Sequence, residues 1–512
     1  MHRRQFLRTF GLGSTLFALG GRRLMAARQT GTGKPRNVIF ILTDDHRYDA
    51  FSFLGHPFLE TPNMDRLALQ GANLKNAFVT TSLCSPSRAS VLTGQYAHKH
   101  QVVDNATRMP EHLRLFPEYL QDAGYKTAFI GKWHMGGSSD EPRRGFDHWV
   151  SFRGQGRYYP PEGNSDWHLN VDGRAMPQTK YITDELTDYA VDWLEQQDDD
   201  QPFFMYLSHK GTHDPFEPAE RHKGAYAGQP FPEPATMANT EENYNDKPMW
   251  VKNQRNSWHG VDFSYHHMRD ATLTELYQRY CEALLSIDES TGRLLDSLEQ
   301  QGRLDDTLIL YMGDNGFQWG EHGLIDKRTA YEASMRVPLL AHCPNLIQPG
   351  TAIEEQVANI DIGPTIMEAA GVSTPDQMDG ASFLRLLSGE KIPWREDLLY
   401  EYFWEYSFPQ TPAMHALRTN KYKYIRYYGV WDLNELYNLE EDPDETVNLF
   451  THPDHQEVVR DMRNRLAAIL EETAGLEIPF RVLPHANNLR LKSGAKPAGF
   501  PEEFMRQKNA QY

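Results

Sequence analysis

Four short apolar runs in this chain of 512 residues each end in side chains that can do chemistry. The runs cover residues 37–43, 127–131, 202–207 and 307–312, and they lead in turn to Asp44 and Asp45, to Lys132 and His134, to His209, and to Asp314 and Asn315. A nearly continuous apolar run is typical of a strand that is buried on both faces of a parallel sheet. Because ligands of open α/β sheets bind beyond the carboxyl ends of the strands, we expect these side chains to converge on one edge.

Oxygen ligands dominate two of these strand ends, where Asp44, Asp45, Asp314 and Asn315 supply three carboxylates and one amide. Such a set suits a hard divalent cation such as Ca²⁺ or Mg²⁺. It lacks the thiolates and the histidine cluster that a structural zinc prefers. Each aspartate alone could equally be a helix cap or a turn residue. Both pairs together at strand ends favour a metal site.

A cysteine stands at the start of a predicted helix that ends before Gly94. Pro86 suits the first turn, and Gly94 is a typical helix stop. Free backbone N–H groups and the positive end of the helix dipole would therefore face Cys84 and favour an anion. Arg88, one turn further on, adds a fixed positive charge. The pattern predicts a reactive group in an anion-binding pocket, although a buried structural cysteine is the alternative.

Other cations are spread along the chain at positions where they can join this pocket. Lys132 and His134 are two residues apart, so they face the same way on an extended segment. His209 follows a strand, whereas Lys327 alone would be explained as a solvated surface lysine. Together with a metal, these groups would bind an anionic tetrahedral group.

The stretch Cys84-Ser85-Pro86-Ser87-Arg88 followed by Leu92-Thr93-Gly94 resembles the signature of the type I formylglycine-dependent sulfatases, which belong to the alkaline phosphatase-like superfamily. Cys-x-Pro-x-Arg alone is moderately specific. Further motifs of the family are similar and come in the same order: Asp44-Asp45, Gly131-Lys132-Trp133-His134, Ser208-His209, Gly313-Asp314-Asn315-Gly316, and residues 321–327. The ordered set is very specific, and the resemblance covers about residues 35–449.

The resemblance implies a cofactor chemistry. In this family a maturation enzyme oxidises the cysteine to Cα-formylglycine (3-oxoalanine), whose hydrate attacks sulfur through one hydroxyl. The family's metal site implies Ca²⁺ held by Asp44, Asp45, Asp314, Asn315 and the modified Cys84.

The resemblance also implies a role for each remaining site residue. Asp314 would accept the proton of the attacking hydroxyl, and Arg88 would stabilise its oxygen. Lys132 and Lys327 would bind sulfate oxygens. His209, alone or with Lys327, would protonate the leaving alcohol, and His134 would take the proton of the second hydroxyl as sulfate leaves.

Residues 204–210 and 326–338 are similar to enzymes that act on sulfated sugars, including N-acetylglucosamine-6-sulfatases. The implied partner is a sulfated carbohydrate, such as a glycosaminoglycan or other polysaccharide fragment. Candidate substrate contacts are His213, Arg153, Arg157 and Trp404, although a structural role is the simpler interpretation of each. A phosphonate monoester or phosphodiester hydrolase of the same superfamily is the first alternative. An inactive protein that binds sulfated glycans is the second.

Composition and the N-terminus constrain partners and location. A net charge of −18 argues against nucleic acid as a partner. The three cysteines are far apart and form no metal spacing and no disulfide framework. Arg3 and Arg4, followed by Phe-Leu and a weakly apolar run, predict a twin-arginine export signal over residues 1–27 and a periplasmic or secreted protein. That run is too short and glycine-rich to predict stable membrane insertion.

Strands that alternate with helices, predicted at 113–123, 184–197 and 273–300, indicate an α/β fold with a large, mostly parallel sheet between layers of helices. A further strand is predicted at 337–341. Residues 417–428 and 435–439 predict antiparallel strands, and 455–473 predict a long amphipathic helix. We therefore expect a catalytic domain over 34–385 and a smaller α+β domain with an antiparallel sheet over 386–512, which ends in an irregular tail.

Overall fold

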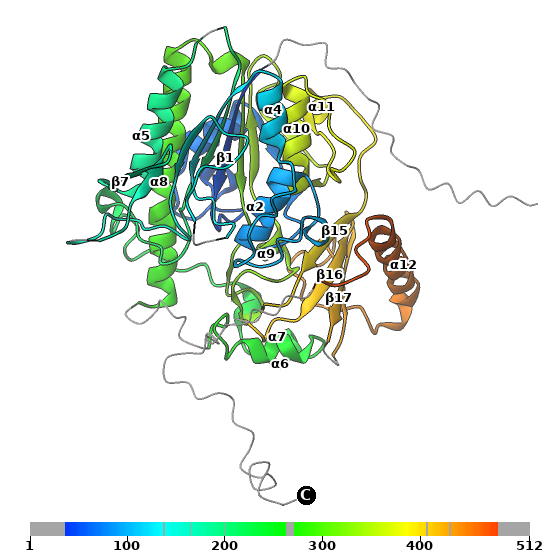
Figure 1. Cartoon of the computed structure of the whole chain (residues 1–512). Coiled ribbons are helices and arrows are strands. Elements are labelled where there is room, and N and C mark those ends of the chain that lie inside the picture. Colours follow the sequence, from blue (N-terminus) through cyan, green and yellow to red (C-terminus); the bar gives the residue numbers. More distant parts are fainter. Residues whose placement is uncertain are drawn as a thin grey trace, which may run out of the picture.

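The computed structural model describes residues 36–136, 139–163, 165–198, 200–262, 271–405, 408–429 and 432–479. The predicted export signal and the tail from residue 480 lie outside these residues. A large sheet crosses the molecule, with helices on both faces and a smaller sheet at one end (Figure 1). Within the part of the chain described, no helix is long and apolar enough to cross a membrane.

The large sheet has ten strands in the order β13-β2-β12-β9-β1-β8-β4-β5-β6-β7. Their bounds are β1 Asn37–Thr43, β2 Ala72–Leu74, β4 Lys126–Gly131, β5 His148–Ser151, β6 Leu169–Val171, β7 Arg174–Met176, β8 Phe203–Ser208, β9 Thr307–Gly313, β12 Leu339–His342 and β13 Thr351–Ile353. The central strands β9, β1, β8, β4 and β5 are all parallel. Strand β12 pairs antiparallel with β9, and β6 pairs antiparallel with β5. The predicted fold class is confirmed.

The central strands have apolar side chains on both faces, as their sequences predict. In β1, Val38, Phe40 and Leu42 belong to one hydrophobic core, whereas Ile39 and Ile41 belong to the other. Successive side chains of a strand point to opposite faces, so one continuous apolar run serves two cores. The parallel strands therefore bring their carboxyl ends to one edge.

Two helical layers cover the two faces (Figure 1). Helices α2 Cys84–Thr93, α4 Phe116–Asp122 and α10 Ile362–Ala369 contribute to the first core; α1 Pro62–Leu69, α5 Ile182–Glu195 and α8 Leu273–Gln300 contribute to the second. Helix α4 is shorter than the predicted 113–123 because Pro117 occupies its first turn and the Glu118 carboxylate accepts a hydrogen bond from the Leu115 N–H at 3.0 Å.

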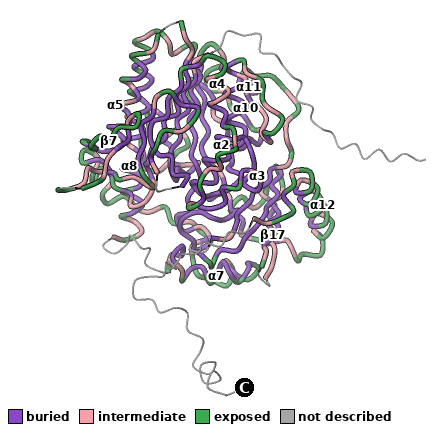
Figure 2. Tube along the Cα trace, in the orientation of Figure 1, coloured by how far each residue is buried: buried purple, intermediate pink, exposed green. Residues whose placement is uncertain are grey.

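The second sheet has the strands β15 Leu398–Tyr402, β16 Ala413–Arg418, β17 Tyr422–Tyr428 and β18 Glu435–Asn438, all antiparallel. Helix α12 Gln456–Glu472 packs against β16 and β17. Tyr400 and Ile425 belong to the same hydrophobic core as Val91 of α2. Figure 2 shows that buried residues extend without a break from the large sheet to the smaller one. The boundary at residue 386 stays a prediction, because one core spans it.

The remaining short elements connect these layers. They are β3 Ala77–Phe78, β10 Gln318–Trp319, β11 Ile325–Asp326, β14 Val357–Ala358, α3 Ala97–His100, α6 Glu241–Tyr244, α7 Met249–Gln254, α9 Glu332–Met335 and α11 Leu384–Leu387.

Candidate active site

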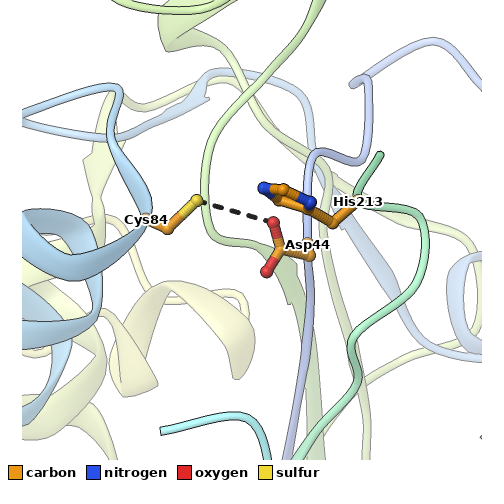
Figure 3. Close-up of side chains that lie close together, drawn as sticks. All are labelled: Asp44, Cys84 and His213. Atoms are coloured by element: carbon orange, nitrogen blue, oxygen red, sulfur yellow. Dashed lines mark hydrogen bonds between the residues drawn. The ribbon is translucent and has the colours of Figure 1, made fainter. Parts of the chain in front are cut away.

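Cys84 is the first residue of α2, and Gly94 ends this helix in the left-handed conformation with φ 65°. The cysteine is completely buried, and its thiol donates to Asp44 Oδ1 at 3.6 Å (Figure 3). Burial, reinforced by the negative charge of Asp44, raises the pKa of the Cys84 thiol. A thiol is nucleophilic as its thiolate, so Cys84 is a poor nucleophile in its unmodified form.

The ends of β1 and β9 lie side by side, because Thr43 pairs with Gly313. One ligand atom from each of Asp44, Asp45, Asp314 and Cys84 lies within 4.8 Å of all the others. The Asp45 N–H donates to Asp314 Oδ1 at 3.1 Å. Asp45 Oδ2 and Asn315 Oδ1 are buried and have no hydrogen-bond partner among the described residues. Buried oxygens of this kind are costly unless something binds them, and hard oxygen donors fit a divalent cation.

Three cations contact these carboxylates. Arg88 donates from Nε to Asp314 Oδ2 at 3.0 Å and from a terminal nitrogen to Asp44 Oδ2 at 2.8 Å. Lys132 pairs with Asp44, and Lys327 pairs with Asp45. Buried charges persist only when they are paired in this way. The cluster therefore combines a metal-type ligand set with positive charge that suits an anionic substrate.

The two aspartates after β1 titrate differently. Burial opposes ionisation of Asp44, but the positive charges of Lys132 and Arg88 outweigh it and hold the pKa of this carboxyl well below its usual range. Burial raises the pKa of Asp45 to about 7, although Lys327 opposes this shift. A bound cation would favour the ionised form of both.

His134 faces the start of α2. Its Nδ1 lies 3.3 Å from the Ser85 hydroxyl, and the side chain is buried. Burial, with the charge of Lys132 added, holds the pKa of His134 well below its usual value. The imidazole is therefore neutral near pH 7 and able to accept a proton.

The structure does not bring His209 to the Cys84 cluster, so its catalytic role stays a prediction. Its Nε2 lies 3.2 Å from the Ser290 hydroxyl of α8. Burial alone lowers the pKa of His209 to about 3. Burial, with the charge of Lys132 added, lowers the pKa of His213 well below its usual value, although the negative charge of Asp44 opposes this shift. His213 instead offers a ring nitrogen within 4.8 Å of ligand atoms of Asp44 and Cys84 (Figure 3). Both histidines follow β8, but of the two only His213 lies near Cys84.

The family is settled by comparison with known proteins. The Sulfatase family model matches residues 36–372, and the model described as N-sulphoglucosamine sulphohydrolase, C-terminal, matches residues 320–472. This chain belongs to the sulfatase family. As a sulfatase it is a sulfuric ester hydrolase, and members of the family generally use formylglycine and a metal ion.

Three relatives are similar over most of the sulfatase. The N-acetylglucosamine-6-O-sulfatase of Bacteroides thetaiotaomicron is 34% identical over 86% of this chain and 86% of its own length. The human N-acetylglucosamine-6-sulfatase is 29% identical over 85% of this chain and 84% of its own. A solved structure of an enzyme in complex with its substrate D-glucosamine-2-N,6-O-disulfate superimposes with a TM-score of 0.79 and 31% identity, covering 87% of this chain and 99% of that one.

The other predicted substrate contacts of the sulfatase have structural partners. Arg153 lies 3.6 Å from an Asp140 oxygen, and the Arg157 guanidinium lies 5.8 Å from the centre of the Trp167 ring. The Trp404 indole donates to the Pro409 carbonyl at 3.3 Å. None of these contacts joins the three side chains to Cys84, and their role as substrate contacts stays a prediction.

One contact that the sequence did not indicate joins the second sheet to the site of the sulfatase. Arg328, next to Lys327, donates from Nε to Glu405 Oε1 at 2.7 Å and also pairs with Asp326. Glu405 follows β15 and accepts a second hydrogen bond from Tyr402 at 2.9 Å. The loop after β15 thus fixes the segment that carries Lys327, a link between residues far apart in sequence.

Proposed function

We propose that this sulfatase removes a 6-O-sulfate from glucosamine in a sulfated carbohydrate, by means of a formylglycine made from Cys84 and a calcium ion. The observation that carries the proposal is the closed cluster in which the Cys84 thiol, 3.6 Å from Asp44, meets carboxylates, lysines and one arginine. The names of the two N-acetylglucosamine sulfatases and the disulfated sugar bound in the related structure support the substrate class.

The ligand set fits the proposed groups. Asp44, Asp45, Asp314 and Asn315, with the modified residue 84, would hold Ca²⁺, and the unpartnered Asp45 Oδ2 and Asn315 Oδ1 are available to it. The hydrated formylglycine supplies a nucleophilic hydroxyl in place of the thiol, and Ca²⁺ supplies positive charge for the oxygens around sulfur.

The protein's own groups bind the anion and move protons. Lys132, Lys327 and Arg88 place positive charge around the sulfate oxygens. The His213 ring donates from Nδ1 to the Asp214 carbonyl at 2.8 Å, so Nε2 is the nitrogen that can exchange a proton in the site. Without substrate, burial and Lys132 favour the neutral ring. The negative charge of a bound sulfate ester would favour the protonated ring, whose Nε2–H would then protonate the leaving alcohol. His134, neutral and beside Ser85, would accept the proton that is released as sulfate leaves.

Maturation and export complete the proposal. Because Cys84 is completely buried in the folded chain, a formylglycine-generating enzyme would modify it before α2 packs. Arg3 and Arg4 with the apolar run that follows support export by the twin-arginine machinery to the periplasm or beyond.

The test compares substrates and the state of residue 84. Protein produced together with a formylglycine-generating enzyme should release sulfate from N-acetylglucosamine-6-O-sulfate, and mass spectrometry should show loss of sulfur and an aldehyde at position 84. Cys84→Ala and Cys84→Ser should both lose turnover, whereas Cys281→Ala, at another buried cysteine, should keep it. Full activity with an unmodified Cys84 would contradict the mechanism. Faster hydrolysis of a phosphonate ester than of sulfate esters would favour the phosphonate hydrolase instead.

A further inference from the structure

One buried lysine lacks the carboxylate that the others have. The lysines with almost no exposed surface are Lys132, Lys210, Lys247, Lys327 and Lys423. Four of them have a carboxylate oxygen within 4.0 Å. Within the described ranges, Lys210 has none at that distance. Burial of an ammonium group without a counter-charge is costly, so the exception calls for an anion that the protein itself does not supply.

The contacts of Lys210 hold its ammonium group without neutralising it. Nζ donates to the Asp214 carbonyl at a long 3.4 Å and lies 4.2 Å from the centre of the Tyr158 ring. The ring face attracts a cation but carries no charge. Burial, with repulsion from Lys132 added, lowers the pKa of Lys210 to about 8, so the side chain is still mostly cationic at neutral pH.

Lys210 also lies next to His213, the proposed proton donor to the leaving alcohol. The His213 N–H donates to the Lys210 carbonyl at 3.0 Å, so the two residues share the turn after β8. The Tyr158 hydroxyl under the ammonium donates to the His213 carbonyl at 2.5 Å. His213 faces Cys84 and Asp44 (Figure 3). The reacting sulfate is already served by Arg88, Lys132 and Lys327, and the charge of Lys210 is left for another group.

We propose that Lys210 binds a second anionic group of the substrate, carried by the sugar that loses the sulfate or by the sugar next to it. This inference rests on the proposed function. Its chemical class is a sulfo group at another position of the same sugar or the carboxylate of an adjoining uronic acid. Lys210 would then select multiply charged glycans over singly sulfated ones. A charge-assisted hydrogen bond inside the site predicts a preference of about tenfold or more in kcat/KM.

The test measures kcat/KM for three substrates. They are N-acetylglucosamine-6-O-sulfate, the same sulfated sugar linked to a uronic acid, and D-glucosamine-2-N,6-O-disulfate. The wild type should have a higher kcat/KM for at least one of the two doubly charged substrates than for the singly charged one. Lys210→Met should lower this preference about tenfold. Lys210→Arg should keep most of it. Lys223→Met is the control, because that exposed lysine lies 5.3 Å from the Tyr159 ring and pairs with Glu220. Lys223→Met should leave kcat/KM for all three substrates unchanged.

An equal loss on every substrate in Lys210→Met would show a structural role and overturn the inference. So would a wild type without preference. Should the variant not fold, inhibition of nitrophenyl sulfate hydrolysis by the wild type decides. Either glucosamine-N-sulfate or N-acetylglucosamine linked to a uronic acid should bind about tenfold more tightly than N-acetylglucosamine, and equal affinities of all three would refute the inference. Hydrolysis of nitrophenyl sulfate without release of sulfate from any sugar would instead contradict the proposed function.

Discussion

The two histidines after β8 differ in what surrounds them. His213 lies among the charges of the Cys84 cluster, whereas His209 points to Ser290 on α8. An alcohol leaves poorly without a proton, so the group that delivers this proton affects turnover strongly. These contacts favour His213 over His209 for the proposed role, although the two side chains are only four residues apart.

His213→Ala should lower kcat for sulfated sugars by about 10²–10⁴-fold. Its effect on nitrophenyl sulfate should be smaller, because that leaving group needs little protonation. His209→Gln, which keeps a donor for Ser290, should stay within about tenfold of wild type on both substrates. Steady-state kinetics of the two variants on both substrates provide the measurement. A larger loss in His209→Gln than in His213→Ala would reverse the assignment.

Sequence reasoning located most of the cluster because each residue follows a strand or begins a helix. Asp44, Lys132 and Asp314 need only the rule that parallel strands end at one edge. His213 was named only as a substrate contact, since its position depends on a turn after β8 whose course no periodicity reveals. Lys210 was not singled out at all. Its missing counter-charge becomes visible only when the neighbours are in place.

Asp45 Oδ2 and Asn315 Oδ1, which have no hydrogen-bond partner among the described residues, lead to a prediction about the metal. Ca²⁺ would bind the folded cluster and not the unfolded chain, so at a hundredfold excess over its Kd it should raise the free energy of unfolding by about 2.7 kcal/mol. The melting temperature should rise accordingly. Asp45→Asn should reduce this shift. Asp288→Asn, at a buried carboxylate that instead accepts hydrogen bonds from the N–H groups of Asn63 and Met64, should keep it. Thermal unfolding with Ca²⁺ and with a chelator measures both; equal shifts in the two variants would contradict the assignment.

At the scale of elements, the backbone at the end of β4 determines where the side chain of Lys132 lies. Gly131 has φ 124°, and an added Cβ would lie 1.8 Å from the Ser208 carbonyl oxygen at the end of β8. That same oxygen accepts the Lys132 N–H at 2.8 Å, and the Ser208 hydroxyl accepts from Arg88 at 2.6 Å. The close approach of these two strand ends therefore sets where Lys132 and Arg88 lie.

Gly131→Ala should displace Lys132, lower kcat/KM by at least about tenfold, and destabilise the fold by more than the 1–3 kcal/mol of a strained backbone alone. Gly124→Ala is the matched control, because Gly124 has φ 89° but open space around its Cβ position. It should cost only about 1 kcal/mol and leave kcat/KM unchanged. Urea unfolding and kinetics of both variants measure the difference. Equal effects would show that the close contact with Ser208 is unimportant.

The long apolar strands were predictable from sequence, because burial on both faces leaves a continuous run. The short edge strands were not. In β7, residues Arg174–Met176 are all exposed and carry no alternation that marks a strand. The pairing of β6 with β7 comes from a tight hairpin that adds two strands to an existing sheet.

At the scale of the whole molecule, the smaller sheet is built into the same core as the site. Its strand β15 donates from the Glu401 N–H to the Thr80 carbonyl at 2.8 Å, just before α2. The loop after β15 holds Arg328 through Glu405. The sequence predicts β17, β18 and the end of β16, but neither β15 nor these contacts. The contacts join residues that lie far apart in the chain or on irregular loops. The smaller sheet therefore supports the catalytic groups directly.

A buried histidine joins three parts of the molecule and should make its stability depend on pH. His98 of α3 pairs through Nδ1 with Glu401 of β15 and donates from Nε2 to the Thr473 carbonyl after α12 at 2.9 Å. Burial would lower the pKa of His98, but Glu401 outweighs it and the pKa is raised. Burial would raise the pKa of Glu401, but hydrogen bonds from His415 and His98 lower it to about 2.

The raised pKa of His98 contributes stability that is complete below its ordinary value of 6.5 and is lost as the pH rises above it. The lowered pKa of Glu401 contributes stability that is complete above its ordinary value of 4.5 and is lost as the pH falls toward 2. His98→Gln should therefore cost about 1–3 kcal/mol near pH 5.5 and progressively less above pH 6.5. The exposed His112→Gln should change nothing. Denaturant unfolding across this pH range tests it, and a cost independent of pH would show that His98 acts by packing and not by its charge.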